Sequence, residues 1–554
     1  MMSNELFQAI KKKASYEEVN EILRKLPEAC TNSEGNSPLH IALRMKSSYD
    51  IIKMLLNANP DAAWVKNKCE NLPLHYALIY KASDDIIKLL LHANYEAIKV
   101  QGNGGWMPLH VGLRYEASDD VIKMLLEANY EATKVEGYDG MLPLHMALEY
   151  KASDDVIKML FKANPEANKV EGFCRKSPLH IALEYKASKN VIEMLLEANY
   201  EATKIQDKNG FLPLHHALAN EASVAVIAML LHANHEAAKV QDKNGWLPLH
   251  LAIIYKASDN IIKMLFKANL DATRVKDNDW KLPLHNALDY KASVNVIMML
   301  LEANYEATKV QDKNGFLPLH HALANEASVD VIAMLLHANH EAAKVQDKNG
   351  WLPLHYALQF EASIDIIMML LNANPKAATV QDNGGRLPLH CAIDKKASNN
   401  IITMLLNANP EATKVQESIF GWLPLHQALN NEASNDIITM LLYANPEATK
   451  VTDNDGWLPL HYALQYKASS DIIKMMFKSN CEATKVHNKH RDFPLHFALQ
   501  KKASSEIIKM LVEAYPEAVK VKNVKGKLPF HYALHWEADP DVIEMLLVTY
   551  QKLQ

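Results

Sequence analysis

The chain has 554 residues and a formal net charge of −6, and only five of its residues are cysteine. So weak a charge on so long a chain provides no basic stripe, and we therefore expect no nucleic-acid partner. The longest apolar runs, such as residues 366–371, are far shorter than the roughly 18–20 residues that span a bilayer. Because residues 1–15 also lack the apolar core of a signal peptide, we expect no membrane insertion.

The cysteines lie far apart in the chain. They are Cys30, Cys69, Cys174, Cys391 and Cys481. An odd number of scattered cysteines is typical of a reducing compartment and favours neither a disulfide framework nor a zinc site. We therefore expect a cytoplasmic protein, and the sequence leaves its entry into the nucleus open.

The first segment of the chain, residues 3–29, resembles a repeat unit that lacks the tripeptide Pro-Leu-His. All later units contain it, except that the last has Pro529-Phe530-His531. Residues 26–29 align with residues 374–377, and lysines crowd the first expected helix. A terminal repeat needs a polar outer face, because no neighbour covers it. The predicted division of the chain is an N-terminal capping repeat over 3–29, inner repeats over 30–530 and a C-terminal capping helix pair over 531–554.

The tripeptide then returns along the whole chain at a nearly constant spacing. Its histidines are His40, His75, His110, His145, His180, His215, His250, His285, His320, His355, His390, His426, His461, His496 and His531. Successive histidines are 35 residues apart, except for His390 and His426, which are 36 apart. A fixed period of this length is the mark of a repeat array, in which each unit contacts only its neighbours. We therefore predict a single solenoid over residues 1–554.

A typical inner repeat runs from residue 346 to residue 380. It begins with a turn sequence that ends at Gly350, where glycine permits a positive φ. Pro353 suits the first position of a helix, whose N–H has no partner in any case. Leu354, Ala357 and Leu358 follow at the i, i+3, i+4 spacing of one apolar helix face.

The second half of that repeat predicts another helix. Ser363 is placed to cap it through its hydroxyl, and the apolar residues that follow predict a helix over about residues 364–372. Asn374 is expected to end this helix in the left-handed conformation that asparagine tolerates. One such helix pair is too small to bury its apolar face alone, so each pair must pack on the pairs before and after it.

Residue by residue, the chain resembles the ankyrin-repeat family. The matching residues of the typical repeat are Asp347, Gly350, Pro353, Leu354, His355, Ala357, Ile366, Ile367, Leu370 and Leu371. The chain departs from the family in its longer repeat, in Leu352 where the family has a capping threonine, and in Lys/Glu-Ala-Ser where the family has a glycine between the helices. The resemblance covers essentially the whole chain. It implies an all-α solenoid of about 16 stacked helix-turn-helix repeats joined by hairpin-like turns.

The motif histidines are the first candidates for a chemical role. Those singled out are His75, His110, His145, His180, His215, His250, His285, His320, His355, His390, His426, His461 and His496. The resemblance implies a buried imidazole that bonds neighbouring turns in every repeat, and the alternative is a row of metal ligands or acid–base groups. Pairs such as His531 and His535 share a helical face, but a zinc site needs further ligands. We expect no catalytic residue, no metal and no cofactor.

Two variable positions of the repeat are rich in aromatic residues, one four residues before the motif histidine and the other five residues after it. The resemblance implies that partners bind the concave face formed by the turns and first helices. The partner-binding residues predicted there are Trp106, Tyr115, Trp246, Tyr255, Tyr290, Phe316, Trp351, Phe360, Trp422, Trp457 and Tyr466. Tyrosine and tryptophan are enriched at interaction hot spots. The alternative is that these rings pack on one another and only stiffen the solenoid.

These features favour a non-catalytic scaffold that binds other proteins on its concave face and is itself a monomeric array. The alternative is a structural spacer or elastic rod with no specific partner. The near-identity of residues 194–250 and residues 299–355 is in keeping with a spacer, because a recently copied surface has had little time to diversify. An enzyme is the least favoured hypothesis, because almost every residue has counterparts in the other repeats.

Overall fold

The computed structural model describes residues 2–25, 34–137 and 140–554. In these ranges the regular secondary structure is entirely helical, with 32 α-helices arranged in pairs and no β-strand. The chain divides into two compact units, Met1–Asn278 and Asp279–Gln554. The predicted all-α solenoid of about 16 helix pairs is confirmed.

Each repeat contributes a first helix and a second helix. In the first unit, the first helices are α1 (Met2–Lys11), α3 (Pro38–Arg44), α5 (Pro73–Ile79), α7 (Pro108–Arg114), α9 (Pro143–Glu149), α11 (Pro178–Glu184), α13 (Pro213–Ala219) and α15 (Pro248–Ile254). The second helices are α2 (Tyr16–Lys25), α4 (Tyr49–Ala58), α6 (Asp84–Ala93), α8 (Asp119–Ala128), α10 (Asp154–Ala163), α12 (Lys189–Ala198), α14 (Val224–Ala233) and α16 (Asp259–Ala268).

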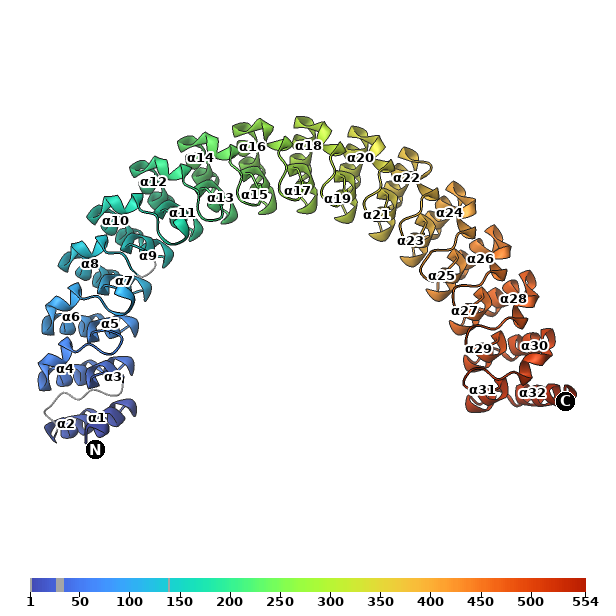
Figure 1. Cartoon of the computed structure of the whole chain (residues 1–554), viewed down its shortest axis with the longest axis horizontal. Coiled ribbons are helices and arrows are strands. Elements are labelled where there is room, and N and C mark those ends of the chain that lie inside the picture. The colour runs from blue at the N-terminus through green and yellow to red at the C-terminus, as the bar shows by residue number, and fades with distance from the viewer. Residues whose placement is uncertain (1, 26–33, 138–139) are drawn as a thin grey trace. The chain divides into compact units, whose positions relative to one another are not determined.

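The second unit follows the same plan. Its first helices are α17 (Pro283–Asp289), α19 (Pro318–Ala324), α21 (Pro353–Gln359), α23 (Pro388–Asp394), α25 (Pro424–Asn430), α27 (Pro459–Gln465), α29 (Pro494–Gln500) and α31 (Pro529–His535). Its second helices are α18 (Val294–Ala303), α20 (Val329–Ala338), α22 (Ile364–Ala373), α24 (Asn399–Ala408), α26 (Asn435–Ala444), α28 (Ser470–Ser479), α30 (Ser505–Ala514) and α32 (Pro540–Lys552). Within each unit the odd-numbered helices form an inner layer and the even-numbered helices an outer layer (Figure 1).

The start of α21 shows how a first helix forms without a capping hydroxyl. Pro353 occupies the first helical position, as predicted, and Leu354 is buried on the apolar face. Leu352 at the N-cap has no side-chain acceptor, but its N–H donates to His355 Nδ1 (3.0 Å) while the His355 N–H donates to the Leu352 carbonyl (2.9 Å). The motif imidazole therefore satisfies a backbone group at the helix end that would otherwise lack a partner.

A serine is the N-cap residue of the second helices from α4 to α30, as predicted, and Asp539 takes that position before α32. The Ser328 hydroxyl accepts a hydrogen bond from the Val331 N–H (3.4 Å), and the Ser434 hydroxyl accepts one from the Ile437 N–H (3.3 Å). Ser363 occupies the same position before α22, but its hydroxyl accepts no capping hydrogen bond. Ser363 therefore occupies the predicted N-cap position, but the predicted hydrogen bond to its hydroxyl is not formed.

The predicted left-handed ending at Asn374 is wrong. Its φ is −139°, and its side-chain Nδ2 donates to the carbonyl of Ala343 in the preceding repeat (3.0 Å). The same bond is made by Asn94, Asn129, Asn164, Asn199, Asn234, Asn269, Asn339, Asn409, Asn445 and Asn480. Because the asparagine side chain joins two repeats here, its backbone stays extended, and this conformation also suits Pro375 as the next residue.

The left-handed residue lies instead between the two helices of the repeat, where the family has glycine. A lysine or glutamate occupies that position with φ between 52° and 60°, as at Lys81 and Glu361. Gly350 has the expected positive φ of 78° in the preceding turn. Each repeat therefore contains a non-glycine residue in a conformation that L-amino acids seldom adopt.

The sequence did not predict the short 3₁₀-helix that follows each second helix from α4 to α30. These helices are η1 (Pro60–Trp64), η2 (Tyr95–Lys99), η4 (Tyr130–Lys134), η5 (Pro165–Lys169), η7 (Tyr200–Lys204), η8 (His235–Lys239) and η9 (Leu270–Arg274) in the first unit. In the second unit they are η10 (Tyr305–Lys309), η11 (His340–Lys344), η12 (Ala377–Thr379), η13 (Pro410–Lys414), η14 (Pro446–Lys450), η15 (Cys481–Lys485) and η16 (Pro516–Lys520). Two more, η3 (Asn103–Gly105) and η6 (Phe173–Arg175), lie in turns.

The predicted capping repeats stay predictions. Residues 26–29, which served to align the first repeat, lie outside the described residues. In the last repeat, Ala533 and Leu546 are buried, whereas Leu534 and Leu547 are exposed. The C-terminal helix pair therefore exposes apolar side chains at its surface.

Candidate functional site

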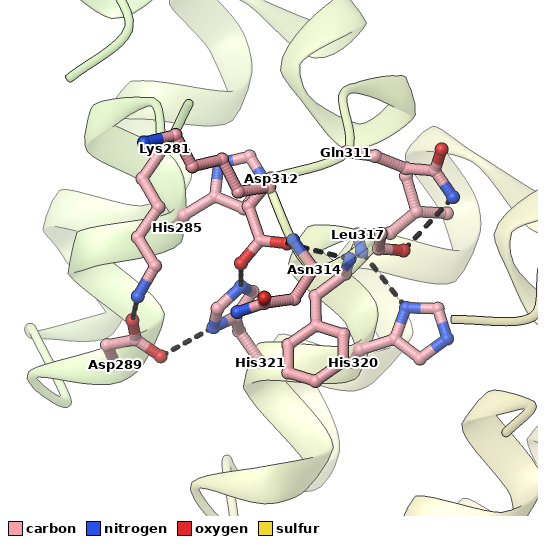
Figure 2. A network of polar contacts seen from close by, with 12 residues as sticks. Lys281, His285, Asp289, Gln311, Asp312, Asn314, Leu317, His320 and His321 are labelled. Atoms are coloured by element: carbon pink, nitrogen blue, oxygen red, sulfur yellow. Dashed lines mark hydrogen bonds and ion pairs between the residues drawn. The ribbon is translucent and has the colours of Figure 1, made fainter. Parts of the chain in front are cut away.

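The motif histidines from His40 to His496 are buried at the junctions between repeats, whereas His531 in the last repeat is exposed. Figure 2 shows the Leu317 N–H donating to His320 Nδ1 (3.0 Å). His320 Nε2 donates to the Val345 carbonyl (3.1 Å) in the segment that leads to the next repeat. His180 donates in the same way to the Phe211 carbonyl (3.2 Å). In other repeats, as at His75, Nε2 faces the equivalent carbonyls without a hydrogen bond of good geometry.

These histidines are neutral at pH 7. Burial lowers the pKa of His320 from its ordinary value of 6.5 to about 4, and the same cause lowers the pKa of His75, His285 and His355 to about 4. Because Nδ1 accepts a hydrogen bond, the single proton of the neutral ring is on Nε2, where it can bond the next repeat. The geometry therefore gives these rings a part in holding repeats together.

The aromatic residues four positions before the motif histidines are half-buried, and Phe316, Trp351 and Trp457 contact other rings. The Trp351 ring lies 5.1 Å from the ring of Tyr356, and Phe316 of the preceding repeat lies 5.7 Å from the same tyrosine. Trp457 lies 4.8 Å from Phe497 in the following repeat. Trp106, Trp246 and Trp422 are half-buried as well. Phe316, Trp422 and Trp457 of this row therefore pack on rings of the following repeat.

Sequence reasoning missed the rings directly after the motif histidine, such as Tyr356 and Tyr462. The Tyr356 hydroxyl donates to Asp347 Oδ2 (2.8 Å), and the other oxygen of Asp347 accepts the N–H groups of Asn349 (2.8 Å) and Trp351 (2.7 Å). The carboxylate thus fixes the turn that positions Trp351. The sequence contains a signal for this contact, because an aspartate recurs eight positions before the motif histidine in many repeats.

The aromatic residues five positions after the motif histidines form a more exposed row at the C-terminal ends of the first helices. Phe360 has 39% of its surface exposed and Tyr466 has 37%. Phe360 stacks on Tyr356 at 6.3 Å, and Tyr466 stacks on Tyr462 at the same distance, so one face of each ring is covered. Tyr255 and Tyr290 are also exposed, whereas Tyr115 is half-buried.

A polar network interrupts the aromatic rows at the start of the second unit. In Figure 2, Lys281 Nζ lies 2.7 Å from Asp289, and His321 lies between two carboxylates, with Nδ1 2.6 Å from Asp289 Oδ1 and Nε2 3.2 Å from Asp312 Oδ2. Only an imidazolium can donate from both nitrogens. The hydrogen bonds to Asp289 and Asp312 outweigh burial and raise the pKa of His321.

The first unit contains a matched site with a different charge state. His216 Nε2 lies 3.0 Å from Asp207 Oδ2, but Glu184, which stands where the second unit has Asp289, pairs with Lys176 (2.6 Å). Burial lowers the pKa of His216, although Asp207 and Glu184 oppose that shift. At equivalent positions of two nearly identical segments, His321 thus favours the charged form and His216 favours the neutral form.

A further set of exposed aromatic residues lies outside the inner layer. Tyr130 and Tyr200 begin 3₁₀-helices, and each has a lysine ammonium within 5.7 Å of its ring centroid. Tyr305 and Tyr443, which are 60% and 75% exposed, occupy η10 and α26. Exposure alone therefore does not distinguish the inner aromatic row from the rest of the surface.

The described residues offer no sign of a metal centre or a membrane-spanning helix. No three His, Cys, Asp or Glu side chains in these ranges gather so as to hold a metal ion. None of the helices in the same ranges is both long enough and apolar enough to cross a bilayer.

These features define the class of protein as a helical repeat solenoid whose repeats are joined by buried histidines, asparagines and shared rings. The family model for ankyrin repeats in three copies matches residues 6–101, 48–136, 74–171, 109–204, 144–237, 179–276, 319–414 and 395–486. Because these matches span well over half of the chain, the chain belongs to the ankyrin-repeat family, as the motifs indicate.

Other comparisons add little to this assignment. No curated relative matches the chain. One solved structure that is similar to part of the chain is the ankyrin repeat domain of Bcl-3, a member of the IkappaB protein family. The sequences are 20% identical, the match covers 42% of this chain and 99% of that one, and the TM-score is 0.35. A likeness this low carries no argument about function.

Proposed function

We propose that the chain is a non-catalytic scaffold that binds partner proteins on the inner face formed by its turns and first helices. The observation that carries this proposal is the row of exposed rings at the ends of the first helices. Phe360 and Tyr466 are each fixed by stacking on a buried tyrosine and leave their other face exposed. A fixed, half-exposed aromatic ring loses little conformational entropy on binding, which is the property of an interaction hot spot.

The experiment compares two pairs of tyrosines in the second unit. Tyr290→Ala with Tyr466→Ala removes inner-face rings, whereas Tyr305→Ala with Tyr443→Ala removes exposed rings outside the inner layer. Partners are captured by cross-linking in cells and quantified by mass spectrometry. We expect at least a ten-fold loss of specific partners for the inner pair and less than a two-fold loss for the control pair. Equal recovery from both variants would count against the inner face.

The rings four positions before the motif histidines are poorer test residues. Trp457 packs on Tyr462 at 5.0 Å and on Phe497 at 4.8 Å, so its removal disturbs contacts between repeats as well as any binding surface. These shared rings support the alternative function, a structural spacer. A spacer predicts that neither tyrosine pair changes partner recovery, because it has no specific partner.

The absence of catalysis is part of the same proposal. The buried motif histidines are neutral and engaged in backbone hydrogen bonds, as at His145 and His285, so they hold no free acid or base at pH 7. For compartment we propose the cytoplasm, which the free thiols of Cys69, Cys174, Cys391 and Cys481 support.

A further inference from the structure

A cavity of about 440 Å³ opens on the inner face of the first unit between α5 and α7. Its walls include Asn71, Ile79, Trp106, Val111, Arg114 and Tyr115. The volume lies in the range of sites that accept small ligands or single side chains. Ile79, Trp106 and Val111 make one wall apolar, and Arg114 is the only ionised side chain that lines the cavity among the described residues.

Arg114 is held in place but has no acidic partner. Its guanidinium carbon lies 4.4 Å from the centroid of the Trp106 ring, and no ion pair joins it to any carboxylate in the described ranges. Two arginines of other repeats do have an acidic partner, since Arg44 lies 3.9 Å from Glu34 and Arg386 lies 2.9 Å from Asp382. A guanidinium fixed against an aromatic ring is already oriented to receive a carboxylate through two parallel hydrogen bonds.

A second unused donor lies across the cavity. The Oδ1 of Asn71 accepts the N–H of Asn103 (3.0 Å), which fixes the orientation of the amide group. The Nδ2 of Asn71 has no hydrogen-bond partner within the described residues, and Asn71 lines the cavity. Glu149 occupies the position of Arg114 in the next repeat but does not line the cavity. The cavity therefore combines unused donors with an apolar wall.

We propose that this cavity binds a carboxylate of a partner peptide, together with a bulky apolar side chain next to that carboxylate in the peptide. The carboxylate pairs with Arg114, and the apolar side chain packs on Trp106 and Ile79. One guanidinium and one amide match a single negative charge better than a phosphate dianion, which calls for several cations. This inference rests on the proposed scaffold function and names the chemistry of one partner segment.

The carboxylate has two sources, an acidic side chain within a peptide or the free C-terminus of a chain. The probes are therefore N-acetylated hexapeptides in matched pairs. One pair contains phenylalanine followed by glutamate or by glutamine, with an amidated end. The other pair ends in phenylalanine, either as the free acid or as the amide. A fifth probe carries phosphoserine in place of the glutamate.

Binding to the full chain is followed by ¹⁹F NMR with fluorotryptophan, in which the Trp106 resonance is assigned from Trp106→Phe. We expect one of the two carboxylate peptides to shift the Trp106 resonance and to bind at least ten-fold more tightly than its neutral partner. Arg114→Gln should weaken that binding at least ten-fold, and Arg114→Lys should weaken it less. Arg44→Gln is the matched control and should leave the affinity unchanged.

Three results would overturn the proposal. They are equal binding of the acidic and neutral peptides, unchanged binding to Arg114→Gln, and tighter binding of the phosphopeptide. The absence of binding by every probe at millimolar concentration would also count against it. The scaffold proposal is tested separately, because the Tyr290 and Tyr466 variants lie in the other unit. If the Tyr290 and Tyr466 variant loses its partners but no peptide binds near Arg114, only the present inference is overturned.

Discussion

At the scale of single residues, two equivalent buried histidines have acidic neighbours that differ by one methylene group. His216 and His321 occupy equivalent positions in two nearly identical segments. Asp289 reaches the Nδ1 of His321 at 2.6 Å, whereas the longer Glu184 pairs with Lys176. The pKa of His321 is raised by its two carboxylates, and the pKa of His216 is lowered by burial.

Exchanging the two acids should exchange the behaviour of the two histidines. Asp289→Glu is expected to lower the pKa of His321, because the carboxylate no longer meets Nδ1, and Glu184→Asp is expected to raise the pKa of His216. The ring Cε1–H signals in an NMR pH titration report both pKa values, with His321→Gln and His216→Gln for assignment. Unchanged pKa values after the exchange would show that these contacts do not set the charge.

The sign of the effect of His321 on stability follows from its raised pKa. A group with a raised folded pKa stabilises fully below its unfolded pKa, near 6.5, and the contribution is lost as the pH rises through the folded value. The destabilisation caused by His321→Gln should therefore be larger at pH 6 than at pH 9. The destabilisation caused by His216→Gln should not decrease as the pH rises.

At the scale of the helix pair, the residue between the two helices carries backbone strain. Lysine or glutamate holds φ between 52° and 60° there, as at Glu361. The left-handed conformation costs an L-residue roughly 1–2 kcal/mol, whereas glycine adopts it freely and loses more entropy on folding. The exposed side chain of Glu361 makes its substitution a test of the backbone rather than of packing.

We expect Glu361→Gly to leave the free energy of unfolding within about 1 kcal/mol of the parent value, because relieved strain offsets the added entropy of the unfolded chain. Glu361→Val should destabilise by roughly 1–3 kcal/mol, since a β-branched residue is a poor fit to positive φ. Hydrogen exchange in the peptides covering α21 and α22 measures both changes. A valine variant as stable as the glycine variant would contradict the strain argument.

At the scale of the whole molecule, a buried neutral histidine in almost every repeat ties stability to pH. His355, His390, His426 and His461 each have a pKa lowered by burial to about 4. Between pH 6.5 and 4 the unfolded chain binds protons that the folded chain excludes. A lowered folded pKa therefore gives stability that is present above pH 6.5 and is lost as the pH falls toward 4.

The melting temperature should fall steeply between pH 7 and pH 5, before most carboxylates titrate. One unit of pKa shift corresponds to about 1.4 kcal/mol for each histidine, and the repeated sites act in the same direction. Circular dichroism at 222 nm as a function of temperature measures the melting temperature at each pH. The salt concentration is held constant, because surface ion pairs such as Lys204–Glu201 also respond to ionic strength. A melting temperature that is independent of pH in this window would contradict the neutral state of the motif histidines.

The sequence alone determined the period and the pairing of helices, because these follow from local patterns that recur in every repeat, and its resemblance to the ankyrin-repeat family implied the burial of the motif histidine. Pro353 and Gly350 show this most directly, since each acts on its own backbone. The left-handed ending predicted at Asn374 was wrong, because its side chain bonds a carbonyl 31 residues earlier. Only the tertiary structure decided which side chains of neighbouring repeats contact one another. It shows that Trp457 contacts Phe497 and that His321 lies between two carboxylates. It also shows that Phe360 stacks on Tyr356 and keeps one face exposed. The physical reason is that these properties depend on atoms of neighbouring repeats, and no local pattern records the distance between such atoms.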